Sequence, residues 1–270
     1  MKLGLIISLN DDLETEFAKV HRIGFPTCQL NCWEQRYFTP EIVQRLSTAS
    51  RRHKVEITAV WCGWEGPVVW DFESGPVTLG LVPPAYRQDR LKTLMRGADF
   101  AAQLGVKNLI THAGYIPENL TDPEYPHIVV ALRLLVSYCR KVGVNFLFET
   151  GQETPVVLLR VIEDIGLDNV GVNLDPANLI AYGKANPVDA LDVIGKYVRD
   201  VHAKDALYPT TGRQLGVEVP LGAGKVNFPS FIARLKEIGY DGPLTIEREI
   251  TGEQQIKDIL MAKELLEGLI

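Results

Sequence analysis

Four residues that can bind a metal or move a proton stand at or near the ends of four short apolar runs. They are Glu149, Asp175, His202 and Glu247, in the runs 144–149, 169–175, 198–204 and 243–247. Three carboxylates at one spot repel each other, and burying them without a counter-charge costs several kcal/mol per ion. Protonation or a divalent cation relieves that repulsion. Three carboxylates and one imidazole suit Mn²⁺ or Mg²⁺, with Co²⁺ or Zn²⁺ also compatible.

These residues form one site only if the runs are neighbouring strands. Short apolar runs at 2–8, 27–31, 55–61 and 107–111 precede the four already named, so eight strands are predicted. Helical patterns lie between them, most clearly at 39–53, 86–104, 122–142 and 253–266. A capping residue followed by proline is expected to start helices, as at Thr39-Pro40 and Asn186-Pro187, and an apolar residue followed by glycine is expected to end them, as at Ile23-Gly24 and Ile194-Gly195.

Eight strands alternating with eight helices in 270 residues predict a single-domain (β/α)8 TIM barrel over residues 1–270. An open doubly wound sheet has the same alternation. Such a sheet usually carries a glycine-rich motif after its first strand, and here Ser8 to Asp12 contains no glycine. In a barrel, polar residues at the carboxyl ends of strands form the active site, so the four residues should converge there. The alternative is that each acid separately caps a helix or pairs with a nearby cation.

Two long connections follow predicted strands, at 62–84 and 206–226, and are expected to border the same site. The first contains Trp64 and Trp70; together with Trp33 they are candidates for lining a sugar pocket, or for anchoring loops. The second contains Gly222-Ala223-Gly224-Lys225, which is either a turn or a phosphate-binding loop of the kind that barrels carry after strands 7 and 8. It is not a Walker loop, because the required spacing is absent.

The chain resembles the xylose isomerase-like barrel superfamily, in particular its sugar phosphate isomerase/epimerase branch. The matching segments are 148–154, 171–178, 201–205, 220–224 and 246–249. The resemblance implies one divalent metal ion held by Glu149, Asp175, His202 and Glu247. It also implies that Glu149 and Glu247 act as an acid/base pair from opposite faces of the substrate.

The chemistry that such a site suits is proton transfer next to a carbonyl. Polarisation of a carbonyl and its neighbouring hydroxyl acidifies the carbon-bound proton and stabilises an enediolate. A carboxylate then removes the proton and an acid returns one. The sequence therefore predicts a metal-dependent isomerase or epimerase of a sugar or keto-polyol. A dehydratase of the inosose or dehydroshikimate type, which starts with the same step, is the alternative.

Three further residues are predicted to bind substrate. His112 ends the fourth strand, and Lys204 shares a strand face with His202. Asn178 stands where some ketose epimerases carry a substrate-binding histidine, a difference that weighs against epimerisation of free ketoses. Glu153 lies near, but not clearly at, the position of a further acid in those enzymes. His112 and Lys204 also have purely structural interpretations, a loop hydrogen bond and an ion pair.

Composition narrows the remaining classes. The formal net charge is −6 with no basic stripe, so neither nucleic acid nor an anionic membrane is an expected partner. Five histidines, three of them in helical patterns, are too few for a trinuclear phosphoesterase site. Four cysteines without a CxxC pair, and no export signal or membrane span, predict a soluble cytoplasmic protein. A homo-oligomer is compatible with the sequence, and a sugar-binding protein without catalysis is the remaining alternative.

Overall fold

The computed structural model describes residues 1–270 and contains a closed barrel of eight parallel strands. The barrel strands are β1 (Lys2–Ser8), β2 (Thr27–Cys32), β3 (Glu56–Cys62), β4 (Asn108–Thr111), β5 (Asn145–Glu149), β6 (Val170–Leu174), β7 (Val198–Ala203) and β10 (Pro243–Ile246). The barrel closes where β1 pairs with β10 on one side and β2 on the other. This confirms the predicted (β/α)8 fold.

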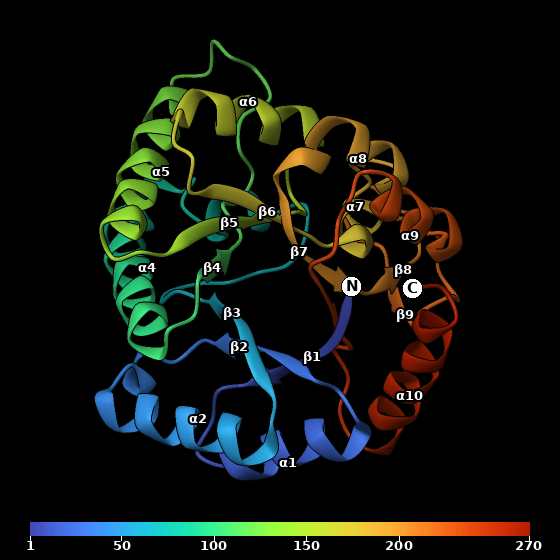
Figure 1. Ribbon diagram of the computed structural model, residues 1–270. Helices are drawn as coiled ribbons and strands as arrows, with labels where there is room; N and C mark the ends of the chain where they lie inside the picture. The colour runs from blue at the N-terminus through green and yellow to red at the C-terminus, as the bar shows by residue number, and fades with distance from the viewer.

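Helices surround the barrel in a ring (Figure 1). They are α1 (Leu13–Ile23), α2 (Pro40–His53), α4 (Pro84–Leu104), α5 (Glu124–Lys141), α6 (Pro155–Ile165), α8 (Pro187–Ile194), α9 (Phe228–Glu237) and α10 (Glu253–Glu267). Buried apolar side chains of strands and helices form one large continuous core. None of the helices combines the length and apolar character that a membrane crossing requires.

Capping chemistry accounts for several of the helix boundaries, and one predicted cap is wrong. The side chains of Thr39 and Asn186 accept hydrogen bonds from the first turns of α2 and α8, as predicted. Gly24 ends α1 in the left-handed conformation, with φ 87°. Gly195 does not end α8 in this way: its φ is −55°, and the chain continues into a 3₁₀ turn at Gly195–Tyr197. A Cβ at Gly195 would lie 3.0 Å from Cδ1 of Ile238, a tight contact with the end of a flexible side chain.

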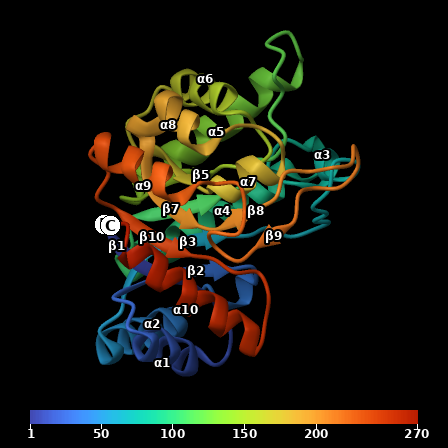
Figure 2. The same cartoon turned by 90° about the vertical axis from the view of Figure 1, so that its right-hand side faces the viewer.

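Both long connections contain short elements that the sequence did not reveal. The one after β3 includes the single-turn helix α3 (Gly75–Thr78), and the one after β7 includes an antiparallel pair, β8 (Asp205–Ala206) with β9 (Glu218–Val219). A further short helix, α7 (Pro176–Ala181), directly follows β6. The two connections lie side by side at the end of the barrel away from the chain termini (Figure 2), where Arg213 of one pairs with Glu73 of the other at 2.6 Å.

Candidate active site

The side chains of Glu149, Asp175, His202 and Glu247 converge at the carboxyl ends of the barrel strands. One ligand atom from each lies within 4.8 Å of all the others. His202 Nδ1 is 3.2 Å from Glu149 Oε1 and 3.0 Å from Glu247 Oε2. Asp175 Oδ2 is 3.8 Å from the same nitrogen. The structure therefore brings together four residues that are separated by up to 98 positions in the sequence.

Local structure orients two of the three carboxylates. Asp175 follows the end of β6 and caps α7, because its Oδ1 accepts a hydrogen bond of 2.8 Å from the backbone N–H of Asn178. Its Oδ2 is left to face the cluster. Glu149 is the last residue of β5, and its Oε2 accepts a hydrogen bond from the indole N–H of Trp61 on β3. Glu149 Oε1 is thereby directed toward His202.

The charges of the cluster stabilise one another. Burial opposes ionisation of Glu247, but the nearby Lys204 and His202 cations hold the pKa of that carboxyl well below its usual range. Burial also disfavours a charged His202, but the carboxylates of Glu149 and Glu247 outweigh it and raise the pKa of the imidazole well above its usual value. A metal ion that binds at His202 therefore competes with a proton for the ring nitrogen.

The donor set fits a divalent cation. His202 Nδ1 and Asp175 Oδ2 are both buried and lack a hydrogen-bond partner, which is costly for polar atoms unless a ligand or ion satisfies them. Three carboxylates with one imidazole form a hard ligand set. On the far side of the ring, His202 Nε2 is 2.6 Å from Gln29 Oε1, the kind of outer contact that metal-ligating histidines make.

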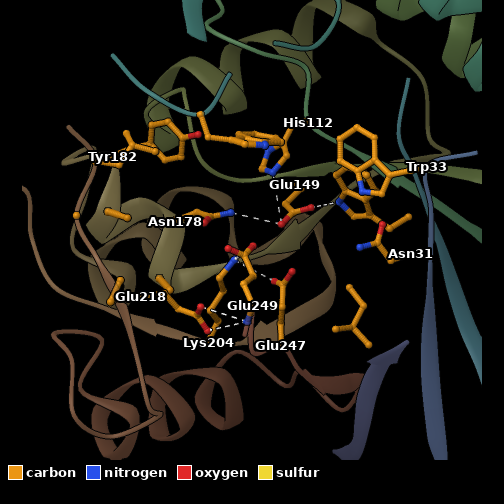
Figure 3. A pocket seen from close by; sticks show the side chains of 18 residues that line it. Asn31, Trp33, His112, Glu149, Asn178, Tyr182, Lys204, Glu218, Glu247 and Glu249 are labelled. Atoms are coloured by element: carbon orange, nitrogen blue, oxygen red, sulfur yellow. Dashed lines mark hydrogen bonds and ion pairs between the residues drawn. The ribbon is translucent and has the colours of Figure 1, made fainter. Parts of the chain in front are cut away.

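A cavity of about 420 Å³ opens onto this cluster (Figure 3). Glu149 and Glu247 line the cavity, whereas Asp175 and His202 are fully buried behind it. The four residues thus divide into two that only face the cluster and two that also reach the space where a substrate would bind.

The three predicted substrate-binding residues all line the cavity. His112 Nε2 is 3.6 Å from Glu149 Oε1, and its Nδ1 has no partner. Asn178 Nδ2 donates to Glu149 Oε1 at 3.4 Å and to the Thr150 carbonyl at 3.2 Å. Lys204 Nζ pairs with three carboxylates, most closely with Glu249 Oε1 at 2.7 Å. Lys204 therefore has both an ion-pairing role and access to the cavity.

Tryptophan side chains form part of the cavity lining, and one of the three predicted tryptophans is not among them. Trp33 and Trp70 line the cavity as expected, but Trp64 does not: it is buried beneath Trp33, where the Arg90 guanidinium lies over its ring. Trp61 takes its place in the lining. Trp61 stands near the end of β3, and this position was the one sequence signal that could have identified it.

The glycine loop does not offer an anion site. The backbone N–H groups of Gly222, Gly224 and Val226 donate to the Asp205 carboxylate at 3.0, 3.0 and 3.1 Å. A side chain at Gly224 would lie 2.1 Å from Asp205 Oδ1, so glycine is needed for this close approach. The amides that would hold a phosphate are already satisfied, and the loop is a turn built around Asp205.

Two acids of the site were missed in the sequence. Glu249 follows Glu247 and pairs with Lys204, and Glu218 on β9 accepts a hydrogen bond from the Glu249 amide at 3.1 Å. Both line the cavity. The Ile246-Glu247-Arg248-Glu249 run contained a signal for Glu249, whereas Glu218 lies in the middle of a long connection and carried none.

Comparisons with known proteins agree with this geometry. A sequence model of the xylose isomerase-like TIM barrel matches residues 17–266. The crystal structure of a xylose isomerase domain protein from Planctomyces limnophilus has a TM-score of 0.94 and 35% identity, covering 99% of this chain and 96% of that one. A D-tagatose 3-epimerase-like protein has a TM-score of 0.75 and 25% identity, covering 100% and 98%. The uncharacterized protein MJ1311 of Methanocaldococcus jannaschii is 26% identical over 285 residues, covering 98% of this chain and 88% of that protein.

Proposed function

This chain belongs to the xylose isomerase-like TIM barrel family, and from its site we propose that it is a divalent-metal-dependent isomerase or epimerase of carbohydrates. The observation that carries the proposal is the convergence of Glu149, Asp175, His202 and Glu247 beside a cavity of about 420 Å³. The similarity to a D-tagatose 3-epimerase-like protein supports it. We propose Mn²⁺ or Mg²⁺ as the resident ion, because hard oxygen ligands dominate the set.

The ion would polarise a substrate carbonyl and the hydroxyl on the adjacent carbon, which acidifies the proton on the carbon that carries that hydroxyl. The chain then has to move that proton. Glu149 and Glu247 are the two cluster residues that line the cavity, so we assign them as the acid/base pair. Trp61 fixes one oxygen of Glu149, and Lys204, 3.3 Å from Glu247 Oε2, steadies the second carboxylate. Removal and return of the proton on opposite faces inverts a centre, whereas transfer to the neighbouring carbon exchanges aldose and ketose.

The substrate is proposed to be an uncharged carbohydrate. Five carboxylates surround the site: Glu149, Asp175, Glu218, Glu247 and Glu249. Their five negative charges exceed the three positive charges of Lys204 and a dication by two. Because the Asp205 carboxylate occupies the glycine-loop amides, nothing remains there to bind a phosphate. The exposed faces of Trp33 and Trp70 offer an apolar surface to the C–H face of a sugar ring. His112 and Asn178 are then placed to bind hydroxyl or carbonyl oxygens.

The test is deuterium exchange measured by NMR. A panel of uncharged ketoses and inososes, with the anion hydroxypyruvate for comparison, is incubated in D₂O with the protein and Mn²⁺. We expect deuterium to enter the carbon next to the carbonyl of one substrate only when metal is present. Glu247→Gln should abolish the exchange, while Glu264→Gln, a change at an exposed residue of α10, should leave it intact.

Three results would count against the proposal. Full exchange in Glu247→Gln would remove that residue from proton transfer. Exchange that survives chelation would remove the metal. Loss of water from an inosose, in place of an isomerised or epimerised product, would assign the chain to the dehydratases, since elimination begins with the same proton removal.

A further inference from the structure

His202 is held from both sides of its ring. Nδ1 faces the carboxylates of Glu149 and Glu247, and Nε2 is 2.6 Å from Gln29 Oε1. Gln29 lies on β2 inside the barrel and is fully buried, as is His202. The two residues are 173 positions apart in the sequence, so only barrel closure brings them together.

The contact with Gln29 determines which ring nitrogen carries hydrogen. The amide oxygen of Gln29 can only accept, so a 2.6 Å contact requires a hydrogen on Nε2 of His202. In a neutral imidazole that arrangement leaves a lone pair on Nδ1, the atom that faces the three acids. Asn173 also lies near Nε2, at 3.2 Å. Its Oδ1 has no partner, and a half-turn of that amide would present the oxygen to the same N–H.

The burial of Gln29 calls for a reason beyond packing. A fully buried amide costs roughly 1–3 kcal/mol where its polar atoms are unpaired, so Gln29 needs polar partners inside the barrel. Leucine or methionine would fill a similar volume without that penalty. The contacts that distinguish glutamine from them are the one with His202 and a hydrogen bond to the Asp200 carboxyl.

We infer that Gln29 is a positioning residue that sets the affinity of the site for a divalent cation. Its side-chain oxygen holds the His202 ring with Nδ1 directed at Glu149, Asp175 and Glu247. The inference rests on the metal site of the proposed function, but not on the identity of the sugar or of the reaction. Outer partners of metal-ligating histidines contribute roughly 10–100-fold to metal affinity.

The experiment measures Mn²⁺ binding by isothermal titration calorimetry, without substrate. We expect Gln29→Leu to raise the dissociation constant by roughly 10–100-fold. Gln29→Glu keeps an oxygen acceptor and should bind Mn²⁺ nearly as well as the wild type. Thr27→Val is the matched control: Thr27 is also fully buried on β2, and it bonds the Leu3 carbonyl at 3.0 Å, away from the site. Gln29→Met replaces Gln29→Leu if circular dichroism shows that the leucine variant does not fold.

The outcomes separate positioning from general stability and from catalysis. Thr27→Val and Gln29→Leu can both lower the free energy of unfolding, but only Gln29→Leu should weaken Mn²⁺ binding. Unchanged binding in Gln29→Leu, or equal weakening in Thr27→Val, overturns the inference. No Mn²⁺ binding by the wild type overturns it together with the proposed metal site. If the expected binding pattern appears without turnover of any sugar, the role of Gln29 stands and the proposed reaction fails.

Discussion

A buried acid close to the site gives a quantitative prediction about stability. Glu153 is 2% exposed, and neither of its carboxyl oxygens has a hydrogen-bond partner. Burial raises the pKa of this carboxyl from its usual 4.5 to about 8. The folded protein therefore keeps a proton on Glu153 at neutral pH, and the unfolded chain releases it.

The sign of the pH dependence follows from this difference. Between pH 4.5 and pH 8 the folded state binds more protons than the unfolded state, so the free energy of unfolding falls as pH rises. Below pH 4.5 the contribution of Glu153 is fully present, and above pH 8 it is lost. A shift of this size corresponds to at most about 5 kcal/mol over the whole window, at about 1.4 kcal/mol per pKa unit.

The perturbation is Glu153→Gln, which has nearly the same shape and does not titrate. Urea unfolding at pH 5, 7 and 9 gives the free energy of unfolding of both proteins. Between pH 5 and pH 9 we expect the free energy of unfolding of Glu153→Gln to rise by several kcal/mol relative to that of the wild type. For Glu163→Gln, an exposed change on α6, the difference from the wild type should stay constant over the same range. A Glu153→Gln curve that is also parallel to the wild type would refute the reasoning.

Three other substitutions probe the loops and the ion pairs. Lys204→Met leaves buried carboxylates without their cation and should lower the free energy of unfolding of the metal-free protein by about 3–5 kcal/mol. An unchanged midpoint of urea unfolding would contradict this expectation. Asp205→Ala removes the acceptor of four backbone N–H groups and should lower the free energy of unfolding by about 3 kcal/mol. It should also make segment 207–216 accessible to protease. Protease resistance equal to that of the wild type argues against the turn built around Asp205. Gly63→Ala places a methyl 2.3 Å from the Trp33 ring and should shift tryptophan emission to longer wavelength; an identical spectrum shows that Trp33 does not move.

The barrel could be predicted because its signals are local. The alternation of apolar strands with capped helices depends on residues a few positions apart, and Thr39 and Asn186 cap α2 and α8 as predicted. The four cluster residues were found for the same reason, since strand ends in a parallel barrel share one rim. Gly195 shows where this kind of pattern fails: its place after an apolar residue predicted a left-handed cap, but its φ is −55° and the chain continues into a 3₁₀ turn.

The rest of the site depends on contacts between distant segments. Trp61 stands near the end of β3, but only the structure shows that it, rather than Trp64, lines the cavity and bonds Glu149. The glycine loop was compatible with a phosphate until the structure placed Asp205 against its amides.

The sequence by itself determined which side chains stand at the rim of the barrel, because strand and helix formation follow from short-range periodicity and capping. Only the tertiary structure decided how those side chains are oriented. Gln29 reaches His202 from 173 positions away, and Glu218 reaches the site from the middle of a long connection. Barrel closure and loop packing create such contacts, and because they join groups that are remote along the chain, no local pattern encodes them.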